Sequence, residues 1–275
     1  MAVAALRRRL AGLEQQAVRK LRRDGELLER LRDDPTLFMS SAGLSPDPWQ
    51  ENVLRSEAER TLLLCSRQAG KSSVSAALAL RSALTRPGFP VLVLSPTLRQ
   101  SGELFRKIVS LNNALGRPVP AVRETTLQME LANGSRIVSL PGTEGTVRGF
   151  REVALLIIDE AARVSDALYY AVRPMLAVSK GRLAALSTPF GQRGWFYDEW
   201  HGTNNWKRVR ITAPECPRIS PEFLAEERRS LGERWYRQEY LCSFEATVDA
   251  VFAAEDIRAA LSDDVRPLFP AAGED

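Results

Sequence analysis

Residues 61–72 read TLLLCSRQAGKS, an apolar run followed by a short loop that ends in the triplet Gly-Lys-Ser. The run 61–66 predicts a buried strand, and the alanine- and leucine-rich residues 72–84 predict a helix. A loop of this kind between a strand and a helix is the context of a phosphate-binding P-loop. The usual first glycine is replaced by Cys65, which we interpret as a small buried residue. An ordinary strand-to-helix turn is the alternative interpretation.

Each residue type in this loop suits a nucleotide. Gly70 lets the backbone approach the phosphates closely. Lys71 would reach the β- and γ-phosphates, and the hydroxyl of Ser72 would bind Mg²⁺. The candidate nucleotide-binding residues are Ser66, Arg67, Gln68, Ala69, Gly70, Lys71, Ser72 and Ser73.

A second candidate motif is an acidic pair, Asp159 and Glu160, which follows the buried run 154–158. In a P-loop enzyme such a strand ends beside the phosphate loop, at the carboxyl edge of the sheet. Asp159 would hold Mg²⁺ and Glu160 would deprotonate the attacking water. A solvated turn is the alternative. Together the two motifs predict Mg²⁺-dependent ATP hydrolysis.

The remaining chain alternates short apolar runs with helical stretches. Buried runs separated by helices indicate an α/β fold, a mostly parallel sheet with helices on both faces. The predicted strands are residues 61–66, 91–95, 127–131, 136–140, 154–158, 183–187 and 206–211, with a hairpin around Asn133-Gly134. The predicted helices are residues 2–32, 51–58, 72–84, 98–115, 166–177, 195–200 and 221–241, and residues 33–49 read as a linker.

Composition excludes several classes of protein. The 275 residues are 44% hydrophobic and 26% charged, which excludes a wholly disordered chain. Apolar runs are too short to cross a bilayer and no secretory signal is evident, so we expect a cytoplasmic protein. The single histidine, His201, excludes histidine triads and multi-histidine metal sites, and three scattered cysteines argue against a disulfide framework. A net charge of +4 permits an anionic partner.

Several further motifs occur in a fixed order over roughly residues 35–260. They are residues 46–50 (PDPWQ), 66–72 (SRQAGKS), 95–97 (SPT), 140–142 (LPG), 146–149 (TVRG), 158–162 (IDEAA), 187–189 (STP) and 238–242 (QEYLC). In this order they resemble the ATPase half of the large terminase subunits of tailed bacteriophages, the ATP-driven motors that package DNA. The resemblance implies a RecA-like P-loop NTPase sheet of the additional-strand catalytic-glutamate class.

The resemblance also implies roles for individual residues. Gln50 would read adenine, and Arg67 would contact phosphate within its own subunit. Arg148 would act as an arginine finger, and whether it serves its own site or a neighbour's stays open. Thr188 would sense the γ-phosphate and couple hydrolysis to movement. A surface salt bridge for Arg148 and a strand-end turn for Thr188 are the alternatives from the residues alone.

Three segments are predicted. Residues 1–34 form an amphipathic basic helix, with a net charge of +5 over residues 1–32. Residues 35–245 form the P-loop ATPase domain, and residues 246–275 form a linker or tail. Family members also carry a C-terminal nuclease domain, but the acids after residue 245 lack strands to organise a two-metal site. We therefore expect no nuclease activity from this chain.

The resemblance implies a set of partners. These are double-stranded DNA, other copies of the chain, the portal protein and the small terminase subunit, with no membrane. The ring would be pentameric on the portal, and isolated chains would be monomeric. The protein would act in the host bacterial cytoplasm, dock transiently on the procapsid and be absent from the mature virion.

Two alternative functions remain. One is a helicase-like ATPase, and the other is a regulatory P-loop binding module outside packaging. Basic side chains are expected to contact the phosphate backbone of DNA. Binding should then be independent of the DNA sequence, because phosphate contacts carry no sequence information. Besides the N-terminal arginines, candidate contacts are Arg99, Arg106, Lys107, Trp206, Lys207, Arg208 and Arg210, and a solvated face is the alternative for each.

Overall fold

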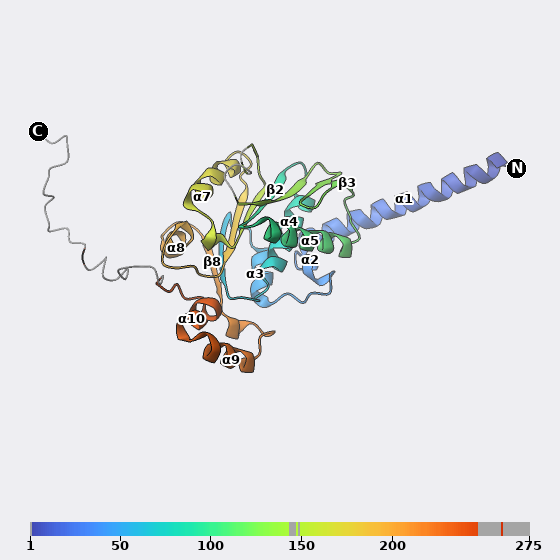
Figure 1. The fold of residues 1–275 in the computed structure, drawn as a ribbon. Helices are drawn as coiled ribbons and strands as arrows, with labels where there is room; N and C mark the ends of the chain where they lie inside the picture. Colours follow the sequence, from blue (N-terminus) through green and yellow to red (C-terminus); the bar gives the residue numbers. More distant parts are fainter. Residues whose placement is uncertain (1, 143–146, 148, 247–259, 261–275) are drawn as a thin grey trace, which may run out of the picture.

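The computed structural model describes residues 2–142, 147, 149–246 and 260 (Figure 1). These residues build one eight-stranded sheet in the order β3-β4-β5-β2-β6-β7-β1-β8. The strands are β1 (Arg60–Cys65), β2 (Pro90–Ser95), β3 (Ala121–Glu124), β4 (Gln128–Leu131), β5 (Arg136–Pro141), β6 (Leu155–Asp159), β7 (Arg182–Ser187) and β8 (Lys207–Ile211). The strands from β5 to β8 in this order run parallel, and β3 and β4 pair antiparallel at one edge.

Strand β7 lies between β1, which leads into the P-loop, and β6, which ends in the acidic pair. An extra strand therefore separates the two nucleotide motifs, as the predicted additional-strand class requires. Every residue of β6 is buried, and β1 and β2 are buried beyond their first residue. This accounts for their continuous apolar sequences, because strands covered on both faces do not alternate in polarity.

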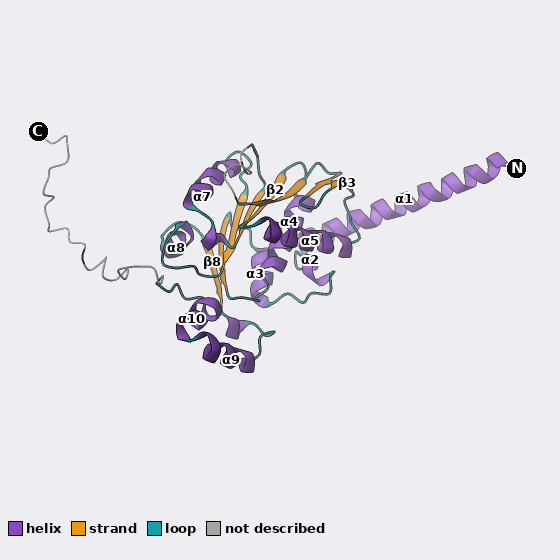
Figure 2. Cartoon of the chain, in the orientation of Figure 1, coloured by secondary structure: helices purple, strands orange, loops and turns teal. Residues whose placement is uncertain are grey.

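Helices cover both faces of the sheet (Figure 2). One hydrophobic cluster packs α3 (Pro48–Arg55), α4 (Lys71–Thr85) and α5 (Leu98–Ala114) against one face, and a second packs α7 (Asp166–Val172) and α8 (Trp195–His201) against the other. A third, small cluster joins α9 (Pro221–Leu231) to α10 (Glu233–Leu241) beside the sheet. The predicted α/β fold with a mostly parallel, two-sided sheet is confirmed.

Helix α1 (Ala2–Asp33) projects from the body and joins it only by its last turns (Figure 1). Leu31 is fully buried and Leu27 and Leu28 pack against the core, whereas Leu10 and Leu21 are more than half exposed. No helix in the described ranges combines the length and the low polarity that crossing a bilayer requires.

The structure corrects three sequence predictions and shows one strand that was not predicted. The predicted linker over residues 33–49 is wrong, because it contains a short helix, α2 (Leu37–Ser40), whose Phe38 and Met39 are buried. Strand β3 was not predicted, because its outer residues are exposed and charged and its apolar pattern is weak. The α-helix predicted over 166–177 ends at Val172 and continues as a 3-10 turn through Pro174, and the helix over 221–241 breaks at Gly232, which adopts a φ of 77°.

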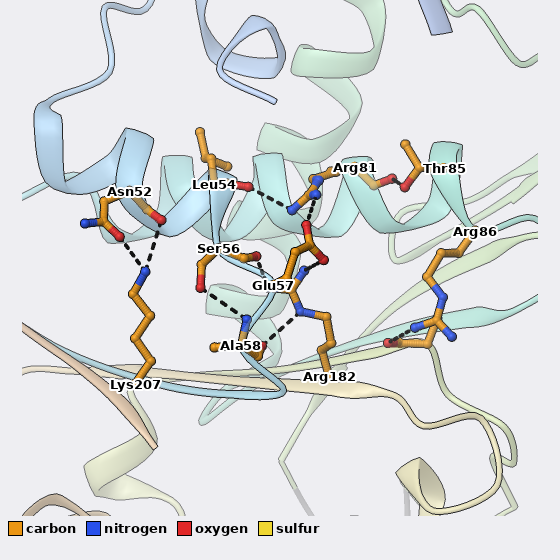
Figure 3. Close-up of polar contacts among 11 residues, drawn as sticks. Asn52, Leu54, Ser56, Glu57, Ala58, Arg81, Thr85, Arg86, Arg182 and Lys207 are labelled. Atoms are coloured by element: carbon orange, nitrogen blue, oxygen red, sulfur yellow. Dashed lines mark hydrogen bonds and ion pairs between the residues drawn. The ribbon is translucent and has the colours of Figure 1, made fainter. Parts of the chain in front are cut away.

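Arginine side chains fasten the loop between α3 and β1 at the amino-terminal edge of the sheet (Figure 3). Arg81 of α4 forms an ion pair with Glu57 at 2.5 Å, and Arg182 of β7 approaches the same carboxylate at 3.5 Å. Arg182 also donates to the carbonyl of Ala58, and Arg86 donates to that of Ser179. A cavity of about 390 Å³ lies beside these contacts. The contacts fix the start of the strand that carries the P-loop at its other end.

A buried carboxylate network holds α8 against the rest of the second face. Glu199 accepts hydrogen bonds from Tyr169 (2.8 Å), Asn204 (2.7 Å) and the indole of Trp206 (2.8 Å). Burial alone raises the pKa of Glu199, but these three hydrogen bonds outweigh it and leave the pKa below its ordinary value. The folded state therefore favours the ionised carboxylate.

We expect Glu199→Ala to lower the free energy of unfolding by about 3 kcal/mol at pH 7, because the buried donors of Tyr169 and Trp206 lose their acceptor, as does the amide of Asn204. A carboxyl whose pKa is depressed on folding stabilises the protein above its unfolded pKa and loses that contribution as the pH falls through the folded pKa. The deficit should therefore shrink once the pH falls below 4.5. Urea unfolding at pH 7 and at a pH below 4.5 measures this deficit in the free energy of unfolding. Glu226→Ala, on the exposed face of α9, is the control. A deficit that is unchanged in acid would contradict this interpretation.

Candidate nucleotide-binding site

A cavity of about 750 Å³ lies at the carboxyl ends of β1, β6 and β7. This is the edge at which parallel α/β sheets place their ligands. The cavity has walls from the P-loop, α5, the turn after β6 and the end of β7. Its lining residues are Arg67, Gln68, Ala69, Gly70, Lys71, Ser72, Gln100, Glu103, Lys107, Glu160, Arg163 and Thr188.

The P-loop conformation depends on Gly70 and on a glutamine packed against it. Gly70 has a φ of 95° at the start of α4, a conformation that other residues rarely adopt. A Cβ at this position would lie 2.5 Å from Nε2 of Gln50, so that side chain is in direct contact with the loop. Gln50 is 2% exposed, and its Oε1 accepts the backbone N–H of Asp47 at 2.8 Å. The glutamine is thus buried and oriented at the edge of the loop.

Lys71 lies at the base of the loop. Its Nζ donates to the carbonyl oxygens of Cys65 (3.3 Å) and Ser66 (3.1 Å). These bonds place the ammonium under the loop, where a phosphate-binding lysine is needed. Cys65 is fully buried and burial raises the pKa of its thiol, so the interpretation of Cys65 as an inert small residue agrees with its environment.

The acidic pair divides between the interior and the cavity. Asp159 ends β6 and is buried, and burial together with the neighbouring Glu160 carboxylate raises its pKa to about 6, against the opposing effect of Lys71. A carboxylate that is costly to ionise in this way is stabilised by a bound cation. Its oxygens and the Ser72 hydroxyl are oxygen ligands, the type that Mg²⁺ prefers, so this donor set fits the ion.

Glu160 lines the cavity and has an unusual backbone conformation. Its φ is 49° and its ψ is 44°, in the left-handed region of backbone conformation. Any residue other than glycine is strained in this region, at a cost in free energy. The turn is closed by the N–H of Arg163, which donates to the Glu160 carbonyl at 2.9 Å, and by the N–H of Ala162, which donates to Oγ of Ser187 at 3.1 Å. The second bond ties this turn to the end of β7, where Thr188 lines the cavity.

Arg67 is held by a residue from α10. Its Nε donates to Oε2 of Glu239 at 2.6 Å, and its backbone N–H donates to the Glu239 carbonyl at 3.1 Å. Hydrogen bonding to Glu239 raises the pKa of Arg67, so the guanidinium stays charged. Glu239 is buried while Arg67 remains largely exposed, so the arginine can leave this partner without losing its solvation.

A second long-range ion pair also contacts the loop. Arg218 contacts both carboxylate oxygens of Asp47 at 2.7 Å and donates to the carbonyl of Ala69 at 3.2 Å. Asp47 precedes the helix that carries Gln50, so this pair connects the glutamine, the P-loop and the segment before α9. Residues beyond β8 therefore reach the P-loop through both ion pairs.

The structure brings most of the predicted site residues together. Eight of them line the cavity, namely Arg67, Gln68, Ala69, Gly70, Lys71, Ser72, Glu160 and Thr188. Gln50, Ser66 and Asp159 lie directly behind this lining, and Ser73 follows in α4. Arg148 lies outside the described residues.

Sequence reasoning quoted Asp47 and Glu239 within motifs but gave them no role, and it did not single out Arg218. It named Lys107 of α5 only as a candidate DNA contact and did not place α5 at the cavity. Several candidate DNA contacts are also used internally: Trp206 is buried on Glu199, Lys207 bonds to Asn52, and Arg210 bonds to the Leu241 carbonyl. Arg99 and Arg106 remain exposed on α5.

Comparison with known proteins agrees with this geometry. The family model described as terminase large subunit, T4likevirus-type, N-terminal, matches residues 62–259, well over half of the chain. The large terminase subunit of Escherichia phage T5 is 26% identical over 227 residues, which cover 78% of this chain and 51% of that protein. The chain spans about half the length of the curated relatives it matches.

Two solved structures share the fold. The ATPase domain of the Thermus phage P74-26 large terminase superposes with a TM-score of 0.66 at 21% identity, covering 75% of this chain and 97% of that chain. The large terminase of another thermophilic bacteriophage, solved in complex with ADP, gives a TM-score of 0.60 at 17% identity, covering 72% of this chain and 53% of that chain.

Proposed function

The chain belongs to the large terminase subunit family, and from that premise we propose that it is a Mg²⁺-dependent ATPase that powers translocation of double-stranded DNA into a viral procapsid. One observation supports this most directly. A single cavity at the carboxyl edge of the sheet gathers the P-loop, Glu160 and Thr188, which are the parts that phosphoryl transfer to water requires.

Each residue has a proposed task. The P-loop N–H groups and Lys71 bind the phosphates, and Gln50 contacts adenine from behind the loop. Asp159 and Ser72 would hold Mg²⁺, which when bound offsets charge on the phosphates. Glu160 takes a proton from the attacking water, and Arg67 leaves Glu239 to stabilise charge on the γ-phosphate.

The same contacts offer a route from hydrolysis to movement. Loss of the γ-phosphate would release Thr188, and the hydrogen bond between Ser187 and Ala162 would pass the shift to the turn that holds Glu160. Arg67 would return to Glu239 on α10, so the position of α10 would follow the nucleotide state.

Assembly completes the proposal. Copies of the chain form a pentameric ring on the portal, whereas the isolated chain is a monomer. In the ring, Arg148 contacts the γ-phosphate bound to a neighbouring subunit. The partners are duplex DNA, the portal protein and the small terminase subunit, in the host cytoplasm and on the procapsid. A monomer and a ring differ in how activity depends on concentration, because only a ring shares its sites.

We expect specific ATPase activity to rise with protein concentration and with linear duplex DNA, and DNA affinity to weaken steeply with salt. Mixing Arg148→Ala chains with Glu160→Ala chains should restore part of the turnover that each lacks, which tests the shared site. Tight ATP binding without turnover under all these conditions would instead favour the regulatory binding module. Specific ATPase activity that changes neither with protein concentration nor with added DNA would contradict the ring motor.

A further inference from the structure

Helix α5 forms one wall of the nucleotide cavity, a contribution that the P-loop and acidic motifs do not account for. Gln100, Glu103 and Lys107 all line the cavity. Their spacing of three and four residues places them on one face of the helix. Helix α5 directly follows β2, and β2 pairs with β6, the strand that ends in Asp159. This face of α5 therefore meets the acidic pair from the side opposite the P-loop.

Of the three side chains, those of Gln100 and Glu103 already have hydrogen-bond partners on α5 or at its N-cap. The amide of Gln100 accepts the Thr97 hydroxyl at 2.8 Å, and the carboxylate of Glu103 accepts Nε of Arg99 at 3.0 Å. Within the ranges that the structure describes, the ammonium of Lys107 forms no hydrogen bond or ion pair. Lys107 therefore brings an unengaged positive charge to the cavity, whereas the charge of Glu103 is already offset.

The other cations that line the cavity already have partners within the protein before a nucleotide binds. Lys71 donates to P-loop carbonyls, Arg67 is bound to Glu239, and the guanidinium of Arg163 stacks 4.2 Å from the centre of the Phe190 ring. Helix α5 follows β2, which pairs with β6, so Lys107 lines the cavity on the side of the acidic pair. Glu160 and Thr188 also line the cavity, and the γ-phosphate would lie beside them.

We propose that Lys107 binds the γ-phosphate from α5, so that the site distinguishes a nucleoside triphosphate from a diphosphate through this helix. The inference rests on the proposed function and adds to it a cation outside the P-loop. A hydrogen bond from an ammonium to a phosphate oxygen is charge-assisted and short-ranged, so its contribution depends on the γ-phosphate being present. Lys107 is then a substrate-binding residue, in place of the DNA contact expected from the sequence.

Equilibrium binding of ATPγS and of ADP, each with Mg²⁺, tests this on the full chain. We expect Lys107→Ala to weaken ATPγS binding by about tenfold to a hundredfold, the effect of losing one hydrogen bond to a charged group, while ADP binding changes less than about twofold. Lys107→Arg should recover most of the affinity for ATPγS. Arg106→Ala is the matched control, because Arg106 is the preceding residue of α5 and is exposed like Lys107 but is not among the residues that line the cavity.

The outcomes separate this inference from the proposed function. If the wild-type chain binds and hydrolyses ATP but Lys107→Ala keeps its preference for ATPγS, the inference fails alone. If Lys107→Ala loses ATPγS and ADP equally, Lys107 supports the site as a whole and the inference also fails. If the wild-type chain binds neither nucleotide, both fail. Selective loss of ATPγS with an unchanged melting temperature supports the inference and excludes a folding defect.

Discussion

Replacing Glu160 by glutamine should lower ATP turnover about a thousandfold while ATP binding stays within a few-fold of the wild type. A positioned general base contributes roughly 10²–10⁴ to a rate, and glutamine keeps the shape of the side chain but cannot take the proton. Glu160 faces the cavity from a strained, left-handed turn that other hydrogen bonds hold in place. The backbone geometry should therefore survive the substitution, and the loss should appear in kcat.

A second carboxylate in the same cavity sharpens this test. Glu103 lines the opposite wall, and Arg99 already holds its carboxylate. Glu103→Gln should therefore lower kcat far less than Glu160→Gln. A thousandfold loss in Glu103→Gln with little change in Glu160→Gln would move the base to α5 and contradict our assignment. Binding of ATPγS to both variants shows whether the site is intact.

Replacing Arg67 by alanine should lower ATP turnover by about a hundredfold or more. An arginine that stabilises charge on the transferred phosphoryl group contributes on this scale or above it. The substitution also leaves Glu239 buried without its cation, which costs stability. Turnover and urea unfolding should therefore be measured on the same preparation.

Two further variants separate these effects. Glu239→Gln removes the charged partner but leaves Arg67 in place, so it should retain more turnover than Arg67→Ala. Arg67→Lys keeps the charge but lacks the planar fork, so it should fall between the wild type and Arg67→Ala. Wild-type turnover in Arg67→Ala would remove this arginine from the proposed chemistry.

The parts of the fold and site that the sequence predicts are local in the chain. The strand that leads into Lys71 and the strand that ends in Asp159 are buried on both faces, so each shows a continuous apolar run followed directly by its chemical groups. The P-loop and the acidic pair were therefore predictable, as was most of the order of strands and helices. Strand β3 was not, because its exposed, charged residues resemble a loop.

The parts that the sequence could not predict depend on contacts between distant segments. Glu239 reaches Arg67 across 172 positions of the chain, and Arg218 reaches Asp47 across 171. Arg106 and Lys107 are adjacent and both exposed, and nothing in the local pattern distinguishes them. Only the packing of α5 brings Lys107, and not Arg106, to the cavity lining. Such pairings follow from the tertiary fold, so motifs alone do not contain them.

Steady-state ATP hydrolysis by the full chain tests the central claim most directly, with and without Mg²⁺ and with Lys71→Ala measured beside the wild type. The account predicts Mg²⁺-dependent turnover that Lys71→Ala reduces to the background rate, because the ammonium under the P-loop is lost. Turnover that survives Lys71→Ala would come from another site or a contaminant. The absence of turnover in a folded wild-type chain, alone and with DNA, would contradict the assignment of this cavity as an ATPase site.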